Sequence, residues 1–167
     1  SMEHSAAELF DRHVELGRLI EQKVKSVYQH VKEERGDKKI HIGFLSGDIY
    51  SHALTSFLEP ILFHLKKDDR FTLSAYATGF KKDAKTEVLK AYFHHFHDCK
   101  IMADELFAEK IYQDKVDILI DLTGHTAFSR LKMLAMKPAP IQASWLGYPG
   151  TSGMQAIDYY KIGRAHV

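Results

Sequence analysis

Two side chains that could take part in proton transfer lie four residues apart in the segment 46–52. Asp48 supplies a carboxylate and His52 an imidazole, and either group could accept a proton from a hydroxyl nucleophile. Backbone amides at the start of the following helix could also hold a phosphate. The alternative is that Asp48 or Ser51 only caps that helix, because both residue types are common N-caps. The spacing taken alone favours the cap over catalysis.

Two further polar segments follow apolar runs. In the first, residues 121–126, Gly124 permits a close backbone approach to a ligand beside His125 and Thr126. Residue types alone favour an ordinary strand-to-helix turn there. The second, residues 147–153, holds three glycines and one proline, which is more than a simple turn needs. Its amides could face a sugar or a phosphate, and a mobile loop is the equal alternative.

The elements that must position these segments alternate between strand and helix. Short apolar runs predict strands at residues 40–45, 71–76, 116–122 and 141–146, with helices at 51–66, 84–93, 103–113 and 128–136. Pro60 is expected to kink or divide the first of these helices. Apolar strands that alternate with helices are typical of a parallel sheet covered on both faces. We therefore expect an α/β, Rossmann-like, doubly wound domain.

In sheets of this class, ligands bind at the carboxyl ends of the strands. Each of the three polar segments follows an expected strand. Five residues are therefore expected on one edge of the sheet: Asp48, His52, His125, Leu146 and Gly147.

Residues 5–33 predict one long amphipathic helix ahead of the sheet. Ser5 and Glu8 have the spacing of a capping box, and apolar residues recur at three- and four-residue steps from Leu9 to Val31. Such a stripe is costly to leave in water, so we expect the helix to pack on the domain through it. Gly17 within the stripe predicts a point of close approach. Residues 1–37 are assigned to this linker helix and 38–161 to the domain.

Composition narrows the classes of function. The 167 residues suffice for one globular domain. A net charge of +1, from 23 basic and 22 acidic residues, gives no sign of a nucleic-acid or anionic-membrane partner. No apolar run approaches the ~20 residues of a membrane span. The single cysteine, Cys99, allows no internal disulfide and fits a reduced, cytoplasmic protein.

Residues of metal-ligating types gather at His94, His95, His97 and Cys99. Zinc sites usually place ligand pairs around a defined loop, with further ligands elsewhere in the chain. The rest of the sequence does not supply that spacing. We therefore expect no metal site, and instead a helix end that runs into a short strand.

The segment 137–153, KPAPIQASWLGYPGTSG, closely resembles the signature stretch of glycosyltransferase family 41. This family contains O-GlcNAc transferases and Spindly-type protein O-fucosyltransferases. Segments 42–48 (IGFLSGD), 117–122 (DILIDL), 124–126 (GHT) and 158–159 (DY) agree in order. Segment 7–13 (AELFDRH) resembles the helix that joins the family's tetratricopeptide repeats to its catalytic core. The resemblance covers about residues 5–160, and the GHT form is closer to bacterial members than to animal ones.

The resemblance implies a GT-B architecture, in which two Rossmann-like domains face a cleft. The first domain shapes the acceptor side and the second binds most of a UDP-sugar. A Ser or Thr hydroxyl of a protein attacks the anomeric carbon with inversion, and UDP leaves. No metal or other cofactor is implied, because side chains and helix-start amides offset the charge of the leaving diphosphate.

Individual positions carry over from the family pattern. Asp48 and His52 match its Asp-x-x-x-His and are the expected catalytic residues. The expected substrate-binding residues are His125, Thr126, Leu146, Gly147 and Tyr148, of which Leu146 and Gly147 match the pair that contacts the donor sugar. Animal members have Tyr where this chain has His125, and Pro-Thr where it has Ala53 and Leu54. GlcNAc is the expected donor sugar, with fucose not distinguished from it.

The resemblance also implies parts beyond this chain: a second catalytic half after it and tetratricopeptide repeats before it. Residues 162–167 depart from the family and are expected to be a non-native tail. We expect the chain alone to transfer no sugar, because binding energy at the leaving group lowers the barrier. The alternative is a stand-alone, flavodoxin-like module that binds a ligand or a protein without catalysis.

Overall fold

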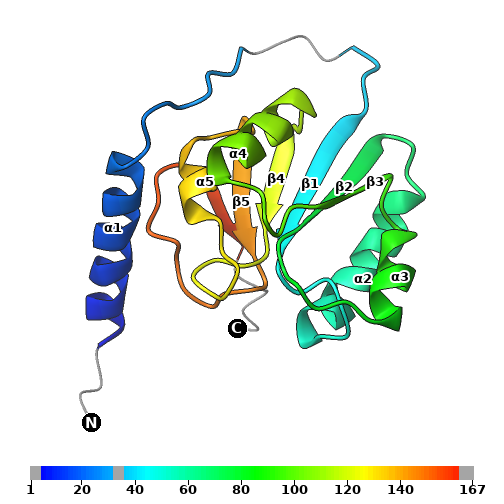
Figure 1. Cartoon of the computed structure of the whole chain (residues 1–167), viewed down its shortest axis with the longest axis horizontal. Helices are drawn as coiled ribbons and strands as arrows, with labels where there is room; N and C mark the ends of the chain where they lie inside the picture. Colours follow the sequence, from blue (N-terminus) through cyan, green and yellow to red (C-terminus); the bar gives the residue numbers. More distant parts are fainter. Residues whose placement is uncertain (1–4, 32–35, 162–167) are drawn as a thin grey trace, which may run out of the picture.

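The computed structural model describes residues 5–31 and 36–161, and shows an α/β domain with one parallel sheet (Figure 1). The expected tail at 162–167 lies outside the described residues, as do residues 32–35. The elements, in chain order, are α1 (Ala6–Gln22), β1 (Ile40–Ser46), α2 (Ala53–Lys66), β2 (Phe71–Ala77), α3 (Ala84–Lys90), β3 (His95–Asp98), α4 (Asp104–Gln113), β4 (Ile118–Asp121), α5 (Leu131–Ala135), β5 (Ile141–Trp145) and β6 (Tyr159–Lys161).

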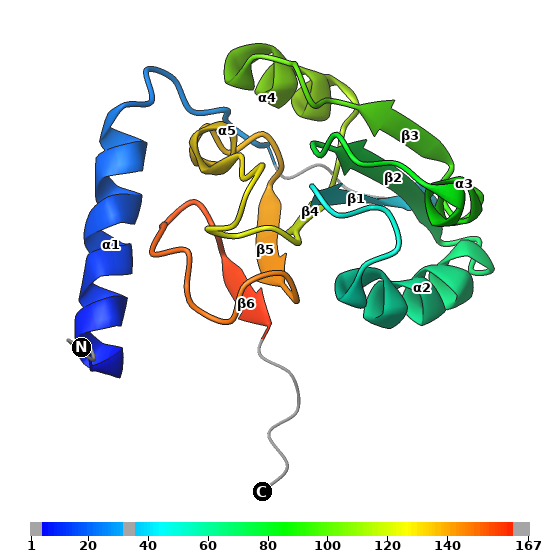
Figure 2. The ribbon, with the colours of Figure 1, turned by 60° about the horizontal axis from the view of Figure 1, so that its bottom comes forward.

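The apolar strands divide their side chains between two cores, one on each face of the sheet. Successive residues of a strand point to opposite faces. In β1, Phe44 therefore packs with α2 and α3, whereas Leu45 packs with α4 and α5. Figure 2 shows these two helix pairs on opposite sides of the sheet. Burial on both faces explains why the strands lack polar alternation, and it confirms the expected Rossmann-like, doubly wound class.

The strand order is β3-β2-β1-β4-β5-β6, with every described pair parallel. This is the Rossmann order, and it differs from the flavodoxin-like order, in which the third strand neighbours the first. The flavodoxin-like alternative is therefore wrong for the fold. Strands β1 to β3 are added toward one edge of the sheet, and strands β4 to β6 toward the other. The topological switch point therefore lies at the carboxyl ends of β1 and β4.

The four expected strands are confirmed, and two more are present. The histidine-rich segment forms β3 as the expected short strand, and β6 has only three residues, too few to give a period in the sequence. The helix around Pro60 is not divided, because α2 runs unbroken from Ala53 to Lys66. Pro60 and Ser56 are both exposed, so water can satisfy the carbonyl that the proline leaves without a donor.

The expected fourth helix starts three residues later than its pattern, at Leu131. Phe128 has a left-handed backbone, with φ of 64°, which does not continue a helix. The Arg130 guanidinium donates hydrogen bonds to the carbonyls of Cys99, Lys100 and Met102. These bonds hold the preceding turn in a non-helical path.

The N-terminal helix is shorter than expected, since α1 ends at Gln22 instead of near residue 33. The expected capping box of Ser5 and Glu8 is present. Beyond the helix, Tyr28 donates a backbone hydrogen bond to the Met136 carbonyl and stacks on Tyr112, with ring centroids 4.4 Å apart. Val24 and Tyr28 pack against the α4–α5 core from this non-helical segment. Tertiary contacts there override a spacing that would also suit a helix.

The helix docks on the domain through the later part of the expected apolar stripe, where Gly17 is buried and Ile20 packs against the α4–α5 core. The start of the stripe lies at the surface, since Leu9 and Phe10 remain 46% and 55% exposed. Gly17 is the buried residue of α1, and it confirms the expected close approach. An added Cβ there would overlap the Gly153 carbonyl. Figures 1 and 2 both show α1 beside α5 and the loop that leads to β6.

The histidines near β3 take part in local contacts. His94 Nδ1 accepts the Leu73 N–H at 2.9 Å, and His97 stacks on Tyr76 with ring centroids 5.1 Å apart. Cys99 is buried, and burial raises the pKa of its thiol to about 12. Within residues 5–31 and 36–161, no group of three His, Cys, Asp or Glu side chains is arranged to hold a metal ion.

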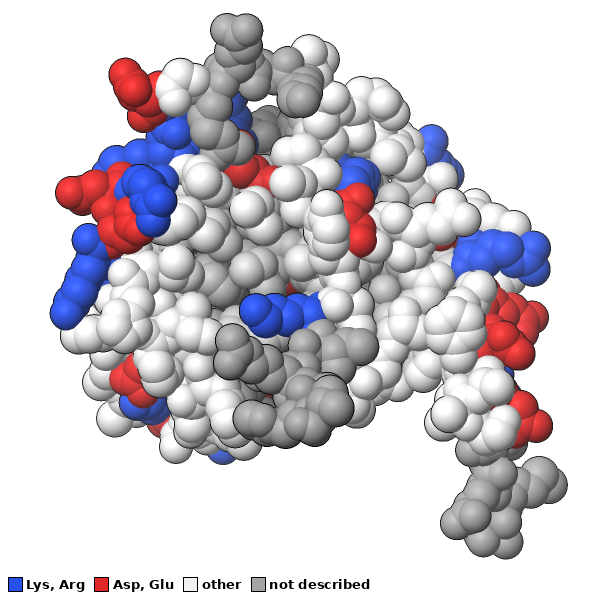
Figure 3. Space-filling view, turned by 180° about the vertical axis from the view of Figure 1, so that it is seen from behind, with Lys and Arg blue, Asp and Glu red and all other residues white. Residues whose placement is uncertain are grey.

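The surface carries charges of both signs. On the face seen in Figure 3, acidic and basic side chains of the described residues lie beside one another, with uncharged surface between them. Among the described helices, none combines the length and the apolar character that crossing a bilayer would require.

Candidate active site at the carboxyl edge of the sheet

A cavity of about 220 Å³ lies where the loops after β1 and β5 meet. It is lined by Asp48, His52, Ala53, Leu54, Phe57, Leu146 and Gly147. The parallel strands bring these loops to one edge, as expected from their place at the strand ends. Four of the expected site residues therefore line one cavity, although Asp48 and His52 are far from Leu146 and Gly147 along the chain.

The Asp48 carboxylate is held within its own loop. The Asp48 N–H donates to Ser46 Oγ at 3.0 Å, and the Tyr50 hydroxyl donates to Asp48 Oδ1 at 3.1 Å. The Ser46 hydroxyl is fully buried at the end of β1, so the rigid sheet fixes this turn. Asp48 itself is half-buried at the cavity, where its carboxylate can accept a hydrogen bond or a proton from a ligand.

His52 is the residue that caps α2, which corrects the sequence expectation. Its Nδ1 accepts the Leu54 N–H at 3.2 Å, whereas the Ser51 N–H donates to Asp83 instead. Neither Asp48 nor Ser51 is the cap. A neutral imidazole has one donor and one acceptor nitrogen. Because Nδ1 accepts a hydrogen bond, the proton of the neutral ring is on Nε2. In this state His52 offers Nε2–H as a hydrogen-bond donor.

Leu146 and Gly147 are held in an unusual backbone conformation at the end of β5. Leu146 has φ of 62°, a left-handed value that costs a residue with a side chain about 1 kcal/mol or more. Gly147 lies so close to β4 that an added Cβ would overlap the Leu122 carbonyl. Strain of this kind persists where the surrounding structure imposes it, often at ligand sites. Leu146 remains 38% exposed and forms part of the cavity wall.

Asp121 ends β4 as a buried carboxyl beside this site. It accepts the N–H groups of Thr123 and Gly124 at 2.9 and 3.0 Å, and these two bonds shape the turn after the strand. Burial raises the pKa of Asp121 to about 6, although both hydrogen bonds act to lower it. The Thr123 hydroxyl is also buried and has no hydrogen-bond partner within the described residues.

Three expected substrate-binding residues lie outside the cavity lining. His125 and Tyr148 face α1, where their rings and the ring of His13 lie 4.9 to 5.6 Å apart. His125 Nε2 donates to the Ser152 carbonyl at 2.9 Å. The exposed Thr126 donates its hydroxyl to the Thr123 carbonyl at 2.8 Å. The structure thus groups His125 and Tyr148 with the helix, and their role toward a substrate stays a prediction.

The family model described as glycosyl transferase family 41 matches residues 3–164 of the chain. The chain belongs to glycosyltransferase family 41. The family assignment agrees with the site, because the signature stretch of residues 137–153 forms β5 and the loop that carries Leu146 and Gly147.

Named relatives within family 41 agree with the assignment. The chain is 35% identical over 162 residues to the probable UDP-N-acetylglucosamine–peptide N-acetylglucosaminyltransferase SPINDLY of Hordeum vulgare, covering 94% of this chain and 17% of that protein. Over 130 residues it is 35% identical to the SEC protein of Arabidopsis thaliana with the same enzymatic name, covering 77% of this chain and 13% of that protein. The chain therefore spans only 13% to 17% of the length of these relatives.

A solved structure shows the same fold. A mutant of the Thermobaculum terrenum O-GlcNAc transferase superposes with a TM-score of 0.85 at 27% identity, over 96% of this chain and 31% of that chain. The Rossmann-like sheet of this chain thus corresponds to one part of a larger family 41 protein.

Sequence reasoning missed three features of the site. Phe57 lines the cavity from one turn further along α2 than Ala53, which helical periodicity could have indicated. Asp121 could have been selected because a carboxylate at the end of a buried strand is unusual. For His13 there was no local signal, since its partner is 135 residues away.

Proposed function

We propose that this chain is the acceptor-side half of the catalytic region of an inverting protein O-glycosyltransferase, which moves GlcNAc from UDP-GlcNAc to Ser or Thr hydroxyls. The observation that carries the proposal is the cavity in which Asp48 and His52 meet Leu146 and Gly147. The names of the Hordeum and Arabidopsis relatives support the donor and the peptide acceptor. In the proposal, the nucleotide is held mainly by a second Rossmann-like domain that faces this edge.

In the proposed reaction, the acceptor oxygen attacks the anomeric carbon as the bond from that carbon to the diphosphate oxygen breaks. The hydroxyl proton leaves the acceptor, and UDP departs with the electron pair of the broken bond. The cap bond at His52 Nδ1 favours a division of roles. Asp48 accepts the proton, and His52 Nε2–H donates a hydrogen bond to the sugar or the acceptor.

The remaining parts of the proposal follow the family resemblance. Leu146 and Gly147 contact the donor sugar, and His125, Thr126 and Tyr148 contribute to the substrate surface around it. The reaction needs no metal or cofactor, since amides and side chains stabilise the leaving diphosphate. The complete enzyme would carry tetratricopeptide repeats before this chain and act in the cytoplasm.

Two substitutions at His52 separate its capping role from its role toward the substrate. His52→Asn supplies a side-chain oxygen that can replace Nδ1 as the cap of α2, because Asn is among the best N-caps, whereas His52→Ala removes the cap at a cost of about 1 kcal/mol. Both remove the Nε2 donor. We expect both variants to lower turnover at least tenfold, and only the alanine variant to lower the free energy of unfolding.

The assay uses the complete enzyme, with radiolabelled UDP-GlcNAc and a Ser- or Thr-containing peptide. Unfolding is followed by circular dichroism in urea. Wild-type turnover in His52→Asn would show that the imidazole serves only as a cap. If the wild-type enzyme transfers no sugar to Ser or Thr, the proposed function itself is wrong and a binding module becomes the better account.

A further inference from the structure

Helix α1 contacts the loop between β5 and β6 along a single line of residues. His13, Gly17 and Glu21 follow one another at four-residue steps, which places them on the same face of the helix. Each one meets a different point of the loop. His13 meets Tyr148, Gly17 meets Gly153, and the Glu21 carboxylate accepts the Ala156 N–H at 2.8 Å.

The first of these contacts is close to the cavity. A hydrogen bond of 2.7 Å joins His13 Nε2 and the Tyr148 hydroxyl, and Tyr148 directly follows Gly147 in the chain. The Tyr148 side chain also lies against Gly124, where an added Cβ would contact it. The Tyr148 carbonyl accepts the Tyr160 hydroxyl at 2.8 Å. Tyr148 is thus held between the turn after β4, the start of β6 and the helix.

The second contact leaves no room for adjustment. The backbones of Gly17 and Gly153 touch, so that a Cβ on either residue would overlap a carbonyl oxygen of the opposite segment. Gly153 also has φ of 72°, a left-handed value that favours glycine. A shift of the helix along or away from the loop would therefore displace the backbone of the loop as well.

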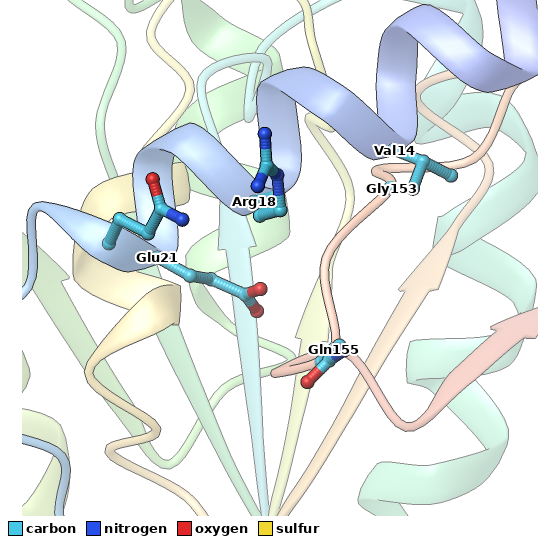
Figure 4. A pocket seen from close by; sticks show the side chains of 6 residues that line it. Val14, Arg18, Glu21, Gly153 and Gln155 are labelled. Atoms are coloured by element: carbon cyan, nitrogen blue, oxygen red, sulfur yellow. The ribbon is translucent and has the colours of Figure 1, made fainter.

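The contact between helix and loop is not continuous. Beside the Gly17–Gly153 approach, an open cavity of about 330 Å³ separates helix and loop, lined by Val14, Arg18, Glu21, Gln22, Gly153 and Gln155 (Figure 4). Figure 4 shows Glu21 extending from the helix toward the loop that carries Gly153 and Gln155. Near Tyr148, the hydrogen bond of His13 links the helix directly to the loop.

We propose that His13 is a positioning residue, through which α1 sets the conformation of Leu146 and Gly147 at the cavity. His13 holds the Tyr148 ring, and Tyr148 holds the strained peptide units that precede it. The helix thereby acts on the part of the cavity that, in the proposed function, contacts the donor sugar. The meaning of this coupling for catalysis rests on the proposed function, but the coupling itself does not.

Amide hydrogen exchange in this chain tests the coupling without any ligand. The Gly147 N–H donates to the Trp145 carbonyl at 2.8 Å, and the Leu122 N–H donates to the Leu45 carbonyl inside the sheet. In His13→Ala we expect exchange at Gly147 to become at least tenfold faster, with exchange at Leu122 unchanged. His13→Gln can still hydrogen-bond the Tyr148 hydroxyl and should restore slow exchange at Gly147. Tyr148→Phe keeps the ring and should behave like His13→Ala.

His30→Ala is the matched control, because His30 Nε2 makes a bond of the same length, 2.7 Å, to the Lys137 carbonyl away from the cavity. It should leave exchange at Gly147 unchanged. Wild-type exchange at Gly147 in both His13→Ala and Tyr148→Phe would overturn the proposal. Equal acceleration at Gly147 and Leu122 would also overturn it, since His13 would then only stabilise the fold.

A second measurement connects the coupling to the sugar. If UDP-GlcNAc shifts the Gly147 amide signal in the wild type, His13→Ala should reduce that shift at least threefold at the same ligand concentration, and His13→Gln should restore it. A full shift in His13→Ala would contradict a positioning role. Absence of any shift in the wild type would count against the proposed function, while the exchange result would still decide the coupling.

Discussion

Replacing Gly147 by alanine is expected to lower the free energy of unfolding by about 3 kcal/mol, the upper range for overpacking a well-ordered site. The added methyl group would overlap the Leu122 carbonyl, which is backbone at the end of β4. Because this oxygen cannot rotate away as a side chain would, β4 and the loop after β5 must move apart. Urea unfolding followed by circular dichroism measures the loss.

Gly150→Ala is the control within the same loop. An added Cβ there would meet first the ring of Tyr148, at 3.0 Å, and a ring can shift by a few tenths of an ångström. We expect a loss below about 1 kcal/mol. Equal losses in the two variants would mean that the approach of Gly147 to Leu122 is not as tight as described.

Asp121→Asn is expected to change the pH dependence of stability by about 2 kcal/mol between pH 4 and pH 7. Burial raises the pKa of Asp121 from 3.8 to about 6. Between these values the native state keeps a proton that the unfolded state has lost. The contribution of Asp121 to stability is therefore greatest below the unfolded pKa and declines as the pH rises through the folded pKa. Asparagine has no such decline.

The measured quantity is the difference in unfolding free energy, variant minus wild type, which should rise from pH 4 to pH 7. The asparagine of Asp121→Asn would have one acceptor oxygen, whereas both carboxyl oxygens of Asp121 accept an N–H. Loss of the second acceptor lowers stability equally at every pH and does not affect this rise. Asp83→Asn is the control. Hydrogen bonds hold the pKa of Asp83 below 3.8, and the bond from the Ser51 N–H has the largest effect. The difference for Asp83→Asn should stay nearly constant over the same range. A constant difference for Asp121→Asn would contradict the buried, proton-retaining carboxyl.

The central fold could be predicted because its strands are buried on both faces. Runs such as residues 40–45 and 116–122 have few polar interruptions, and that pattern, alternating with helices, is typical of parallel sheets. The end of α1 could not be predicted, because Val24 and Tyr28 continue a helical spacing while their position is decided by Met136 and Tyr112. Long-range contacts of this kind leave no periodic trace in a single sequence.

The site was predictable to the extent that it depends on strand ends. The rule for parallel sheets brought Asp48, His52, Leu146 and Gly147 together correctly. It could not assign the cap, because Asp, Ser and His all lie at the start of α2, and the choice of His52 depends on backbone direction. Nor could it predict that His125 lies outside the cavity lining, because the ring of His125 contacts His13 of α1, which is distant in the sequence.

The most direct test of the central claim is an amide NMR titration of this chain with UDP-GlcNAc, with UDP alone as the comparison. Binding to one half of a two-domain site should be weak, in the millimolar range, because few ligand atoms are held. We expect UDP-GlcNAc to shift the amide signals of Asp48, His52, Leu146 and Gly147, the residues around the cavity, and UDP alone to leave them unchanged. Equal shifts with UDP alone, or shifts confined to residues away from these loops, would contradict a sugar-binding cavity at this edge of the sheet.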